Sequence, residues 1–308
     1  MTDISFGQRL DRRLLKQGFR AGWPLLTLNL ITARRMAAAP SAQFAAHRLA
    51  RPIVTGSEWA SYIPKQEGYR AFSPDSFPQL SKIVSSGQSV FARHEAQVTG
   101  LKNFNKPYFF NVMTADDLRK YPIFLDFALS GAVTEAVTGY VGRLPRLHSM
   151  GIFYSPVNGT LGGSQIFHVD GDGLTQVKCF VNIWEVGTGG GGFTFFPKPL
   201  TSRSFRRDGL LKTLTDADVY RTVPEERQIV AKGPPGSGVF VDTSRCLHQG
   251  SRATERPRLV FQFQYVSRPD ALLPRYLDRA THGGHLHVTR GLLEDIKFDK
   301  PNTLMFID

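Results

Sequence analysis

The stretch Phe167-His168-Val169-Asp170-Gly171-Asp172-Gly173 (FHVDGDG) places a histidine and an aspartate two residues apart and follows them with glycines. In an extended strand, residues i and i+2 point to the same side and lie about 6.5–7 Å apart along the backbone. The His168 imidazole and the Asp170 carboxylate can therefore converge on one ion. A His-x-Asp pair alone is weak evidence, because roughly four in ten random chains of this composition contain one. The pair predicts a metal site only together with a third ligand.

His248 offers that third ligand, in the segment Cys246-Leu247-His248-Gln249-Gly250-Ser251. Two neutral imidazoles and one carboxylate on one side of a metal are the facial triad of non-heme Fe(II) oxygenases, which leaves open positions for a cosubstrate and dioxygen. We therefore predict that His168, Asp170 and His248 are metal ligands and catalytic residues.

The C-terminal half reads as a series of short β-rich runs separated by Gly and Pro. The runs cover residues 146–154, 164–169, 175–186, 192–197, 227–231, 237–242 and 257–266. Strands at this spacing after a helical half predict an α+β, mainly β fold, an antiparallel sandwich or jelly roll with helices packed outside it.

Helical signals precede these strands. Apolar spacing predicts two short helices within residues 5–38, interrupted by Pro24, whereas residues 39–110 read as irregular. Thr114 followed by two acids predicts a helix start, and a second helix is expected from Phe127 to Tyr140, ending at Gly142.

Two of the predicted strands assign their side chains to opposite faces, because alternation in a strand has a period of two. In residues 176–184, the apolar face holds Val177, Cys179, Val181 and Ile183, and the other holds Gln176, Lys178, Phe180, Asn182 and Trp184. In residues 258–265, the apolar face holds Leu259, Phe261, Phe263 and Tyr265, and the other holds Arg258, Val260, Gln262 and Gln264. A polar face on so apolar a strand predicts a pocket.

Arg258 lies on that polar face. A guanidinium offers a fixed two-pronged donor to a carboxylate, which a keto-acid cosubstrate would present from its far end. Arg256 competes for this role, but Pro257 separates the two arginines and only Arg258 shares a face with Gln262.

Several segments together resemble the phytanoyl-CoA dioxygenase-like group of Fe(II)/2-oxoglutarate dioxygenases. They are Ser164-Gln165-Ile166-Phe167-His168-Val169-Asp170, Asn182-Ile183-Trp184-Glu185-Val186, Phe193-Thr194-Phe195-Phe196-Pro197, His248-Gln249-Gly250-Ser251 and Arg256-Pro257-Arg258, within residues 128–266. The resemblance implies a cupin-like double-stranded β-helix with flanking helices and a helical N-terminal extension. It also implies Fe(II) held by His168, Asp170 and His248, with 2-oxoglutarate and O2 as cosubstrates and Arg258 pairing with the distal carboxylate of 2-oxoglutarate.

Further cofactor-binding residues are expected around the metal, namely Gln165, Lys178, Asn182, Trp184 and Ser251, although Trp184 serves equally well as a structural anchor. The chain departs from the family pattern after Pro197, where it reads Lys198-Pro199-Leu200, and in the glycine run 187–192. These departures lie in loops near the pocket mouth, where the substrate would bind.

The expected function is oxidation, foremost hydroxylation, of an unactivated C–H bond in a small molecule, with release of succinate and CO2. Halogenation is disfavoured because related halogenases carry a small residue where this chain has Asp170. The alternative is a non-catalytic metal-binding β-domain that acts as a sensor or adaptor. Arg258 argues against it, since a metal holder needs no carboxylate clamp.

Net charge is +12 over 308 residues, and residues 1–52 carry nine Lys and Arg against two Asp. This basic extension, ahead of a dioxygenase domain at 53–308, fits a solvated helix, a membrane-surface helix, a transit peptide or a docking face for an anionic partner. The charge also favours an anionic or carrier-linked substrate. Basic residues without stacking aromatics or a recognition motif give no nucleic-acid signature.

No apolar stretch near the N-terminus reaches the about 20 residues needed to span a bilayer. Two cysteines, Cys179 and Cys246, fit a reducing compartment, so a cytoplasmic protein is expected, with organellar targeting by the N-terminus left open. His282, His285 and His287 form a second possible metal cluster, but we favour a polar loop because no carboxylate accompanies them at strand spacing.

Overall fold

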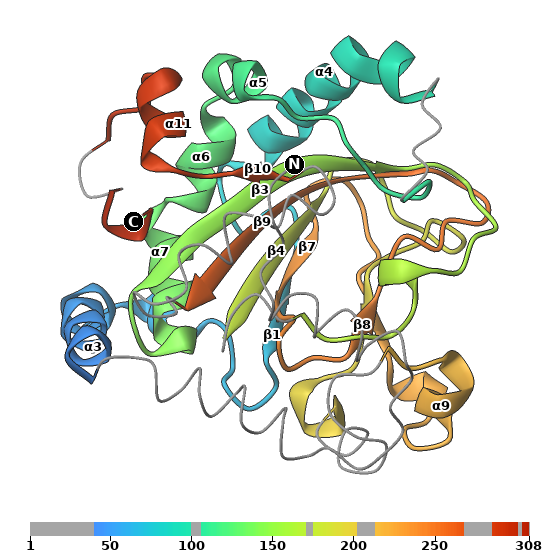
Figure 1. Cartoon of the computed structure of the whole chain (residues 1–308), viewed down its shortest axis with the longest axis horizontal. Helices are drawn as coiled ribbons and strands as arrows, with labels where there is room; N and C mark the ends of the chain where they lie inside the picture. Colours follow the sequence, from blue (N-terminus) through green and yellow to red (C-terminus); the bar gives the residue numbers. More distant parts are fainter. Residues whose placement is uncertain are drawn as a thin grey trace, which may run out of the picture.

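Two antiparallel β-sheets and a layer of helices make up the part of the chain that the computed structural model describes, which comprises residues 40–99, 106–170, 175–201, 213–267, 285–300 and 304–307. The large sheet has the order β1 (Tyr69–Phe72), β7 (Gly238–Asp242), β4 (Gln176–Asn182), β9 (Arg258–Ser267), β3 (Pro145–Ser155) and β10 (Leu286–His287), and β2 (Phe110–Asn111) also pairs with β3 (Figure 1). The small sheet has the order β6 (Ile229–Val230), β5 (Thr194–Phe195) and β8 (His248–Gln249).

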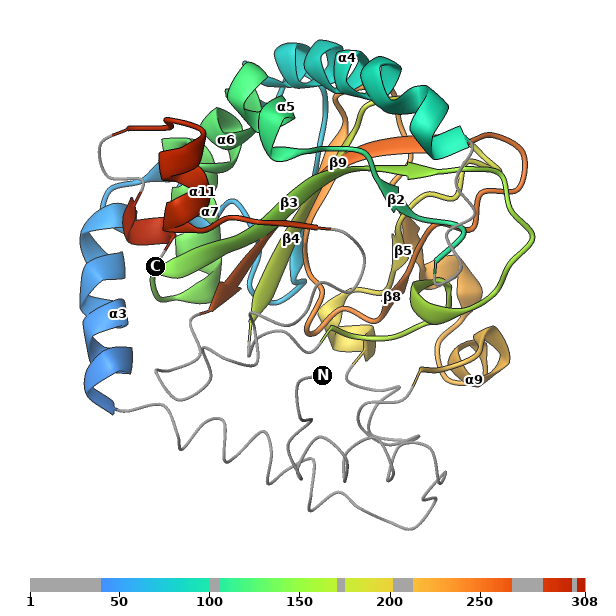
Figure 2. The ribbon, with the colours of Figure 1, turned by 45° about the horizontal axis from the view of Figure 1, so that its top comes forward.

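Helices cover one face of the large sheet. These are α4 (Leu80–Thr99), α5 (Ala115–Lys120), α6 (Ile123–Ala128) and α7 (Gly131–Val141), which form an arc over the strands in Figure 2. The remaining helices are α3 (Pro40–Val54), α9 (Asp216–Tyr220) and α11 (Arg290–Asp295), with short 3-10 turns η1 (Glu58–Ser61), η2 (Gly163–Gln165), η3 (Glu225–Arg227) and η4 (Leu304–Phe306).

The main hydrophobic core lies between this helical layer and the large sheet. The predicted apolar face of β4 is confirmed, because Val177, Cys179, Val181 and Ile183 are all buried in it. The apolar face of β9 is confirmed in the same way, with Leu259, Phe261, Phe263 and Tyr265 buried. The opposite faces of β4 and β9 point away from this core, to the other side of the large sheet.

The prediction that residues 39–110 are irregular is wrong. The segment contains α3, β1 and the 20-residue helix α4, whose apolar side chains, including Ile83 and Val90, are buried against the sheet. Ser and Gly between those positions mask the helical pattern in the sequence. Gly87 is needed for close packing, because a Cβ there would lie 2.7 Å from Cδ1 of Ile183.

Two further expectations are corrected. Residues 164–169 form the turn η2 and isolated bridges at Phe167 and His168 in place of a regular strand. The helix expected from Phe127 to Tyr140 is interrupted, since α6 ends at Ala128 and α7 begins at Gly131. Its predicted end is confirmed, because Gly142 caps α7 in the left-handed conformation with φ 75°.

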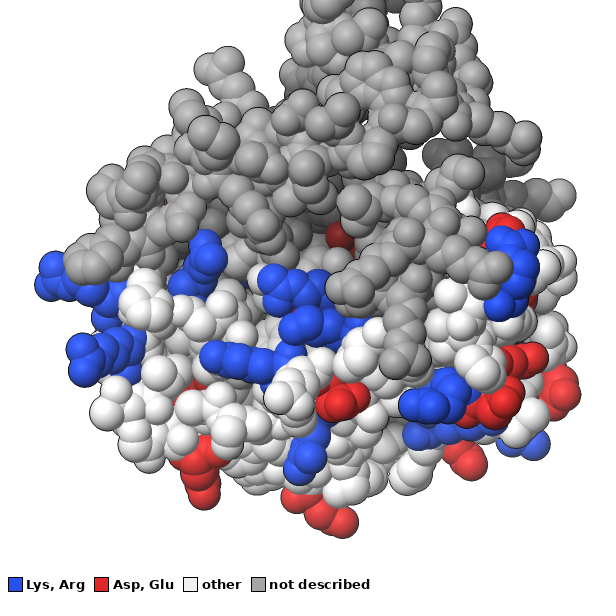
Figure 3. All heavy atoms as spheres, turned by 90° about the horizontal axis from the view of Figure 1, so that it is seen from below, with Lys and Arg blue, Asp and Glu red and all other residues white. Residues whose placement is uncertain are grey.

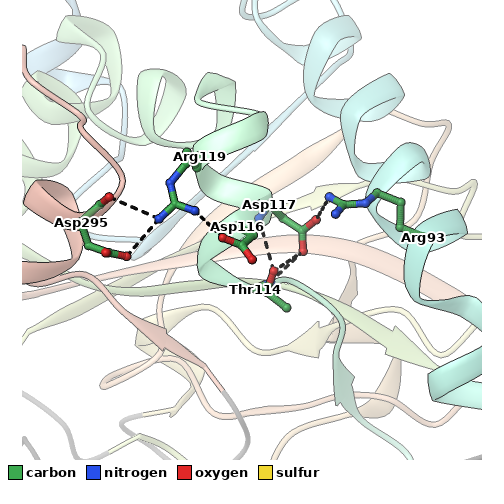
Figure 4. Close-up of polar contacts among 6 residues, drawn as sticks. All are labelled: Arg93, Thr114, Asp116, Asp117, Arg119 and Asp295. Carbon is green, nitrogen blue, oxygen red and sulfur yellow. Dashed lines mark hydrogen bonds and ion pairs between the residues drawn. The ribbon is translucent and has the colours of Figure 1, made fainter.

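Helix α5 ties three elements together, as Figure 4 shows. The predicted helix start at Thr114 is a full capping box, in which Thr114 and Asp117 bond each other's backbone N–H. Asp117 is completely buried and accepts from Arg93 of α4 at 2.6 Å. Arg119 pairs with Asp116 and reaches Asp295 of α11 at 3.2 Å. The C-terminal helix is thereby fixed to the helical layer.

Helix α3 runs across residue 52, where we predicted a boundary between extension and domain. The helices expected within residues 5–38 lie outside the described residues. On the face seen in Figure 3, one group of Lys and Arg side chains lies near the middle and others lie at the left edge and toward the right, while Asp and Glu are scattered over the middle, lower and right parts. No helix in the described ranges combines the length and apolarity needed to cross a bilayer.

Candidate metal centre

The three predicted ligands meet at one point. His168 and His248 exchange two backbone hydrogen bonds, each 2.9 Å long, and the Asp170 N–H donates to the Thr243 carbonyl at 2.9 Å. His168 and Asp170 are thus held in extended backbone beside β8, although no regular strand contains them. One ligand atom from each of His168, Asp170 and His248 lies within 4.8 Å of the other two.

Backbone carbonyls orient both imidazoles. Nδ1 of His168 donates to the Ile166 carbonyl at 2.8 Å, and Nδ1 of His248 donates to the Cys246 carbonyl at 2.9 Å. Since a carbonyl can only accept, the proton of each neutral ring resides on Nδ1 and the lone pair on Nε2. Those Nε2 atoms lie 3.7 and 3.6 Å from the Asp170 carboxylate oxygens. Both rings therefore present a metal-binding nitrogen toward the carboxylate.

Asp170 is held by two donors from β4. Its Oδ2 lies 2.8 Å from Lys178 Nζ and accepts from Gln176 Nε2 at 3.0 Å. Burial by itself would raise the pKa of the Asp170 carboxyl, but the charges of Lys178, His248 and His168 outweigh it and hold the pKa far below its ordinary value. The pKa of His248 is lowered to about 3, chiefly by burial. At neutral pH the centre therefore offers a carboxylate and a neutral imidazole.

A cavity of about 240 Å³ opens beside this centre. The predicted polar face of β9 lines it through Arg258, Gln262 and Gln264. Lys178 and Phe180 of β4 line it as well, and His248 and Phe193 contribute from the side of the small sheet. The predicted pocket therefore exists, and it lies between the two sheets.

Arg258 lines the cavity with part of its hydrogen-bonding capacity unused. Its side chain is buried, and Nη2 donates to Ser251 Oγ at 3.0 Å. Nε has no hydrogen-bond partner among the described residues. Burial lowers the pKa of Arg258 to about 10, so the guanidinium stays charged at neutral pH. Ser251 adopts a positive φ of 63°, which is uncommon for a residue with a side chain.

Of the other predicted cofactor-binding residues, Lys178 and Ser251 line the cavity, whereas the remaining three do not belong to its lining. Gln165 is fully buried behind it and donates to the Ser251 carbonyl at 2.9 Å. Asn182 donates to Ser237 Oγ at 3.1 Å. Trp184 packs edge-on against Phe91 of α4, with ring centroids 4.8 Å apart, which corresponds to the structural-anchor alternative.

Sequence reasoning missed two parts of the cavity. Phe193 packs on Phe180 with ring centroids 4.3 Å apart and on His248 at 5.2 Å. Phe193 follows the glycine run and belongs to a segment that resembles the dioxygenase family, but nothing in the residue pattern indicates that its ring points inward. His148, His285 and His287 also line the cavity. The spacing of the last two was a usable signal, because residues two apart on a strand share a face.

Comparison with known proteins finds no matching family model and no matching curated protein. Among solved structures, SnoK, a non-heme alpha ketoglutarate dependent carbocyclase from nogalamycin biosynthesis, is 16% identical over 75% of this chain and 93% of its own, with a TM-score of 0.46. EctD from S. alaskensis, with 2-oxoglutarate and 5-hydroxyectoine, is 16% identical over 69% of this chain and 76% of its own, with a TM-score of 0.46. HygX from Streptomyces hygroscopicus, with nickel and 2-oxoglutarate bound, is 17% identical over 68% and 87%, with a TM-score of 0.45. These values are too low to assign a function to this chain by themselves.

Proposed function

We propose that this chain is an Fe(II)- and 2-oxoglutarate-dependent dioxygenase that oxidises a C–H bond of a small molecule, and that its two sheets are those of a double-stranded β-helix. In the overall reaction one oxygen atom of O2 enters the substrate and the other enters succinate, as 2-oxoglutarate loses CO2. The observation that carries the proposal is the convergence of His168, Asp170 and His248 inside a cavity that also holds Arg258.

The donor set fits ferrous iron. Two imidazoles and one carboxylate are the ligands that non-heme Fe(II) sites use, and Nε2 of both rings is available because Nδ1 is engaged with a carbonyl. His168, Asp170 and His248 would hold the ion, and bound iron would supply the activation of dioxygen. Lys178 and Gln176 fix the Asp170 carboxylate through Oδ2, which leaves Oδ1 for the ion.

Arg258 fits the far carboxylate of 2-oxoglutarate. A charged, buried guanidinium whose Nε is unpartnered among the described residues requires an acceptor, and an anion satisfies both the charge and the hydrogen bond. Ser251 Oγ accepts from Nη2 and so aims the guanidinium. Phe193 and Phe180 stack beside His248 and exclude water from one wall of the cavity.

The test is succinate formation by the purified full-length protein with Fe(II), ascorbate, O2 and 2-oxoglutarate. Slow turnover without substrate is expected for the wild-type protein, and His168→Ala should abolish it because the metal loses a ligand. His47→Ala is the matched control, since His47 is exposed and bonds only the Gly142 carbonyl among the contacts described. Its succinate rate should equal that of the wild type.

The alternative, a metal-binding β-domain without catalysis, predicts a different result. Such a protein would bind the metal through the same three residues but would neither bind 2-oxoglutarate when metal-loaded nor release succinate. Metal binding that His168→Ala removes, combined with no detectable 2-oxoglutarate binding to the wild type, would overturn the dioxygenase proposal.

A further inference from the structure

A second group of histidines lines the cavity on the side of the edge strand β10. His287 of β10 pairs with Ser149 of β3, and the Val288 N–H donates to the His148 carbonyl at 3.0 Å. His148 lies at the irregularity in β3 where the register with β9 shifts. Its ring meets that of His287 edge-on, with centroids 5.0 Å apart. We refer to His148 of β3 together with His285 and His287 as the β10 histidines, because all three lie at this edge of the sheet.

The β10 histidines are connected to the metal centre by one row of polar residues across the large sheet. Lys178 of β4 is opposite Gln264 of β9, Gln264 is opposite Ser149 of β3, and Ser149 is opposite His287. All four residues line the cavity. The row therefore begins beside Asp170 and ends at the β10 histidines, so a molecule bound along it would reach from one to the other.

Two imidazole nitrogens of this group have no hydrogen-bond partner among the residues that the structure describes. Nδ1 of His285 and Nε2 of His287 are buried and make no hydrogen bond to any described residue. Buried polar atoms are satisfied in the large majority of cases, and leaving one without a partner costs free energy. Both residues line the cavity, so a molecule bound at their end of it is the partner that we consider for these nitrogens.

The charge of the surroundings limits what that molecule can be. Lys106, Lys178 and Arg258 line the cavity, and Asp170 is the one acidic residue in the described lining. Burial, together with the charges of Lys178 and Lys106, lowers the pKa of His285 to about 3, so its ring is neutral. A cationic group would be repelled here. The charges of a divalent metal and a doubly charged cosubstrate cancel, so the three cationic side chains and Asp170 leave the lining with a net positive charge.

We propose that His285 and His287 bind an anionic group of the substrate, a carboxylate or a phosphate, at the end of the cavity away from Arg258. The inference rests on the proposed function, because it assigns to the substrate the part of the cavity that 2-oxoglutarate does not need. Each ring donates one N–H to the anion. The uncharged part of the substrate lies along the row Lys178–Gln264–Ser149–His287 and passes next to the metal site.

The position of these rings is fixed by the segment that follows. Val288, Leu293 and Ile296 are buried in the main core, and α11 is capped by Thr289, whose hydroxyl accepts from the Leu292 N–H at 3.1 Å. Arg119 of α5 adds the contact with Asp295. Side-chain changes at His285 or His287 should therefore leave the anchoring of β10 intact.

The experiment is a titration of the full-length protein with inorganic phosphate, followed by the NMR signals of labelled histidines. The protein is loaded with Zn(II) and 2-oxoglutarate, so that the metal centre and Arg258 are occupied and no turnover occurs. Saturable shifts of the His285 and His287 ring signals are expected, with assignments from His285→Gln and His287→Gln. The dissociation constant should rise about tenfold in the double variant, since each lost hydrogen bond to a charged group weakens binding.

Three controls make the outcome decisive. His47→Gln should bind phosphate like the wild type, and thermal denaturation should show that the double variant is folded. If the His285 and His287 signals do not move in the wild type, or if the double variant binds phosphate as tightly, the proposal is overturned. Succinate formation by the same proteins loaded with Fe(II) in place of Zn(II) tests the two proposals separately. Turnover without phosphate binding overturns only the anion site, and phosphate binding without turnover overturns only the dioxygenase proposal.

Discussion

The ammonium nitrogen of Lys178 lies 2.8 Å from Oδ2 of Asp170, so one of the three proposed metal ligands has a basic side chain as its direct neighbour. The two charges have opposite effects on metal binding. Lys178 repels a cation, but it also keeps Asp170 ionised against the effect of burial and fixes its orientation together with Gln176. Residues that orient a ligand in this way typically contribute a factor of about 10 to 100 to metal affinity.

Lys178→Met should therefore weaken Co(II) binding by about 10- to 100-fold at neutral pH. Without Lys178 the effect of burial on Asp170 is offset less, so the pKa of its carboxyl rises and protons compete with the metal. The variant's affinity should fall more steeply with falling pH than that of the wild type, because in the variant Asp170 takes up a proton as well. Metal titration at neutral and mildly acidic pH measures this. Lys232→Met, at an exposed site, should match the wild type.

Arg258→Gln should raise the KM for 2-oxoglutarate by about thirtyfold, which corresponds to about 2 kcal/mol for hydrogen bonds to a charged group. The pKa of Arg258 stays near 10, so the wild-type KM should not change across neutral pH on account of this group. Steady-state succinate kinetics measure the KM, and Co(II) affinity should be unchanged. A KM equal to that of the wild type would exclude Arg258 as the carboxylate partner.

The convergence of the three proposed ligands could be predicted in part from the sequence, because the spacing that indicates it is local and periodic. Spacing of two placed His168 and Asp170 on one side, and alternation along residues 258–265 separated the buried face from the face that lines the cavity. Trp184 does not follow the alternation, which predicted that it shares the face of Lys178. Strand β4 ends at Asn182, and the N–H groups of Ile183 and Trp184 both donate to the Leu259 carbonyl, so alternation no longer holds beyond that point.

Helix α4 and the β10 histidines could not be predicted for a different reason. Helix α4 packs closely on Ile183, just after the end of β4, at Gly87, and a pattern read from neighbouring residues cannot reveal this contact. His285 and His287 face the cavity only because β10 pairs with β3, far away in the chain. The spacing of two between His285 and His287 is visible in the sequence. The pairing with β3, which decides the direction in which these side chains face, is not.

Asp117→Asn should lower the free energy of unfolding by about 2 kcal/mol, because a buried carboxylate that accepts from Arg93, His94 and Thr114 loses its charge. Burial alone would raise the pKa of Asp117, yet the Thr114 and His94 contacts lower it below its ordinary value. Its stabilising contribution is therefore present above that ordinary pKa and is lost as the pH falls. Denaturant unfolding should show the wild type and variant converging in acid. Asp116→Asn is the control, since its side chain is 74% exposed.

Gly139→Ala sets two effects of opposite sign against each other in helix α7. Helix propensity alone would stabilise the variant by about 1 kcal/mol, since alanine is favoured over glycine inside a helix. A Cβ at Gly139, however, would lie 2.0 Å from the Ala60 carbonyl oxygen in η1, a backbone atom that cannot move aside without shifting the turn. Overpacking of this kind costs about 1–3 kcal/mol.

We expect the steric effect to win, so thermal unfolding of Gly139→Ala should occur at a lower temperature than that of the wild type. Gly131→Ala in the same helix is the matched control, because its Cβ would meet only the end of the Glu135 side chain, at 3.3 Å. That variant should be as stable as the wild type or slightly more so. If Gly139→Ala were also stabilised, the close packing of α7 on η1 would be wrong, and with it the way this part of the helical layer is fixed over the large sheet.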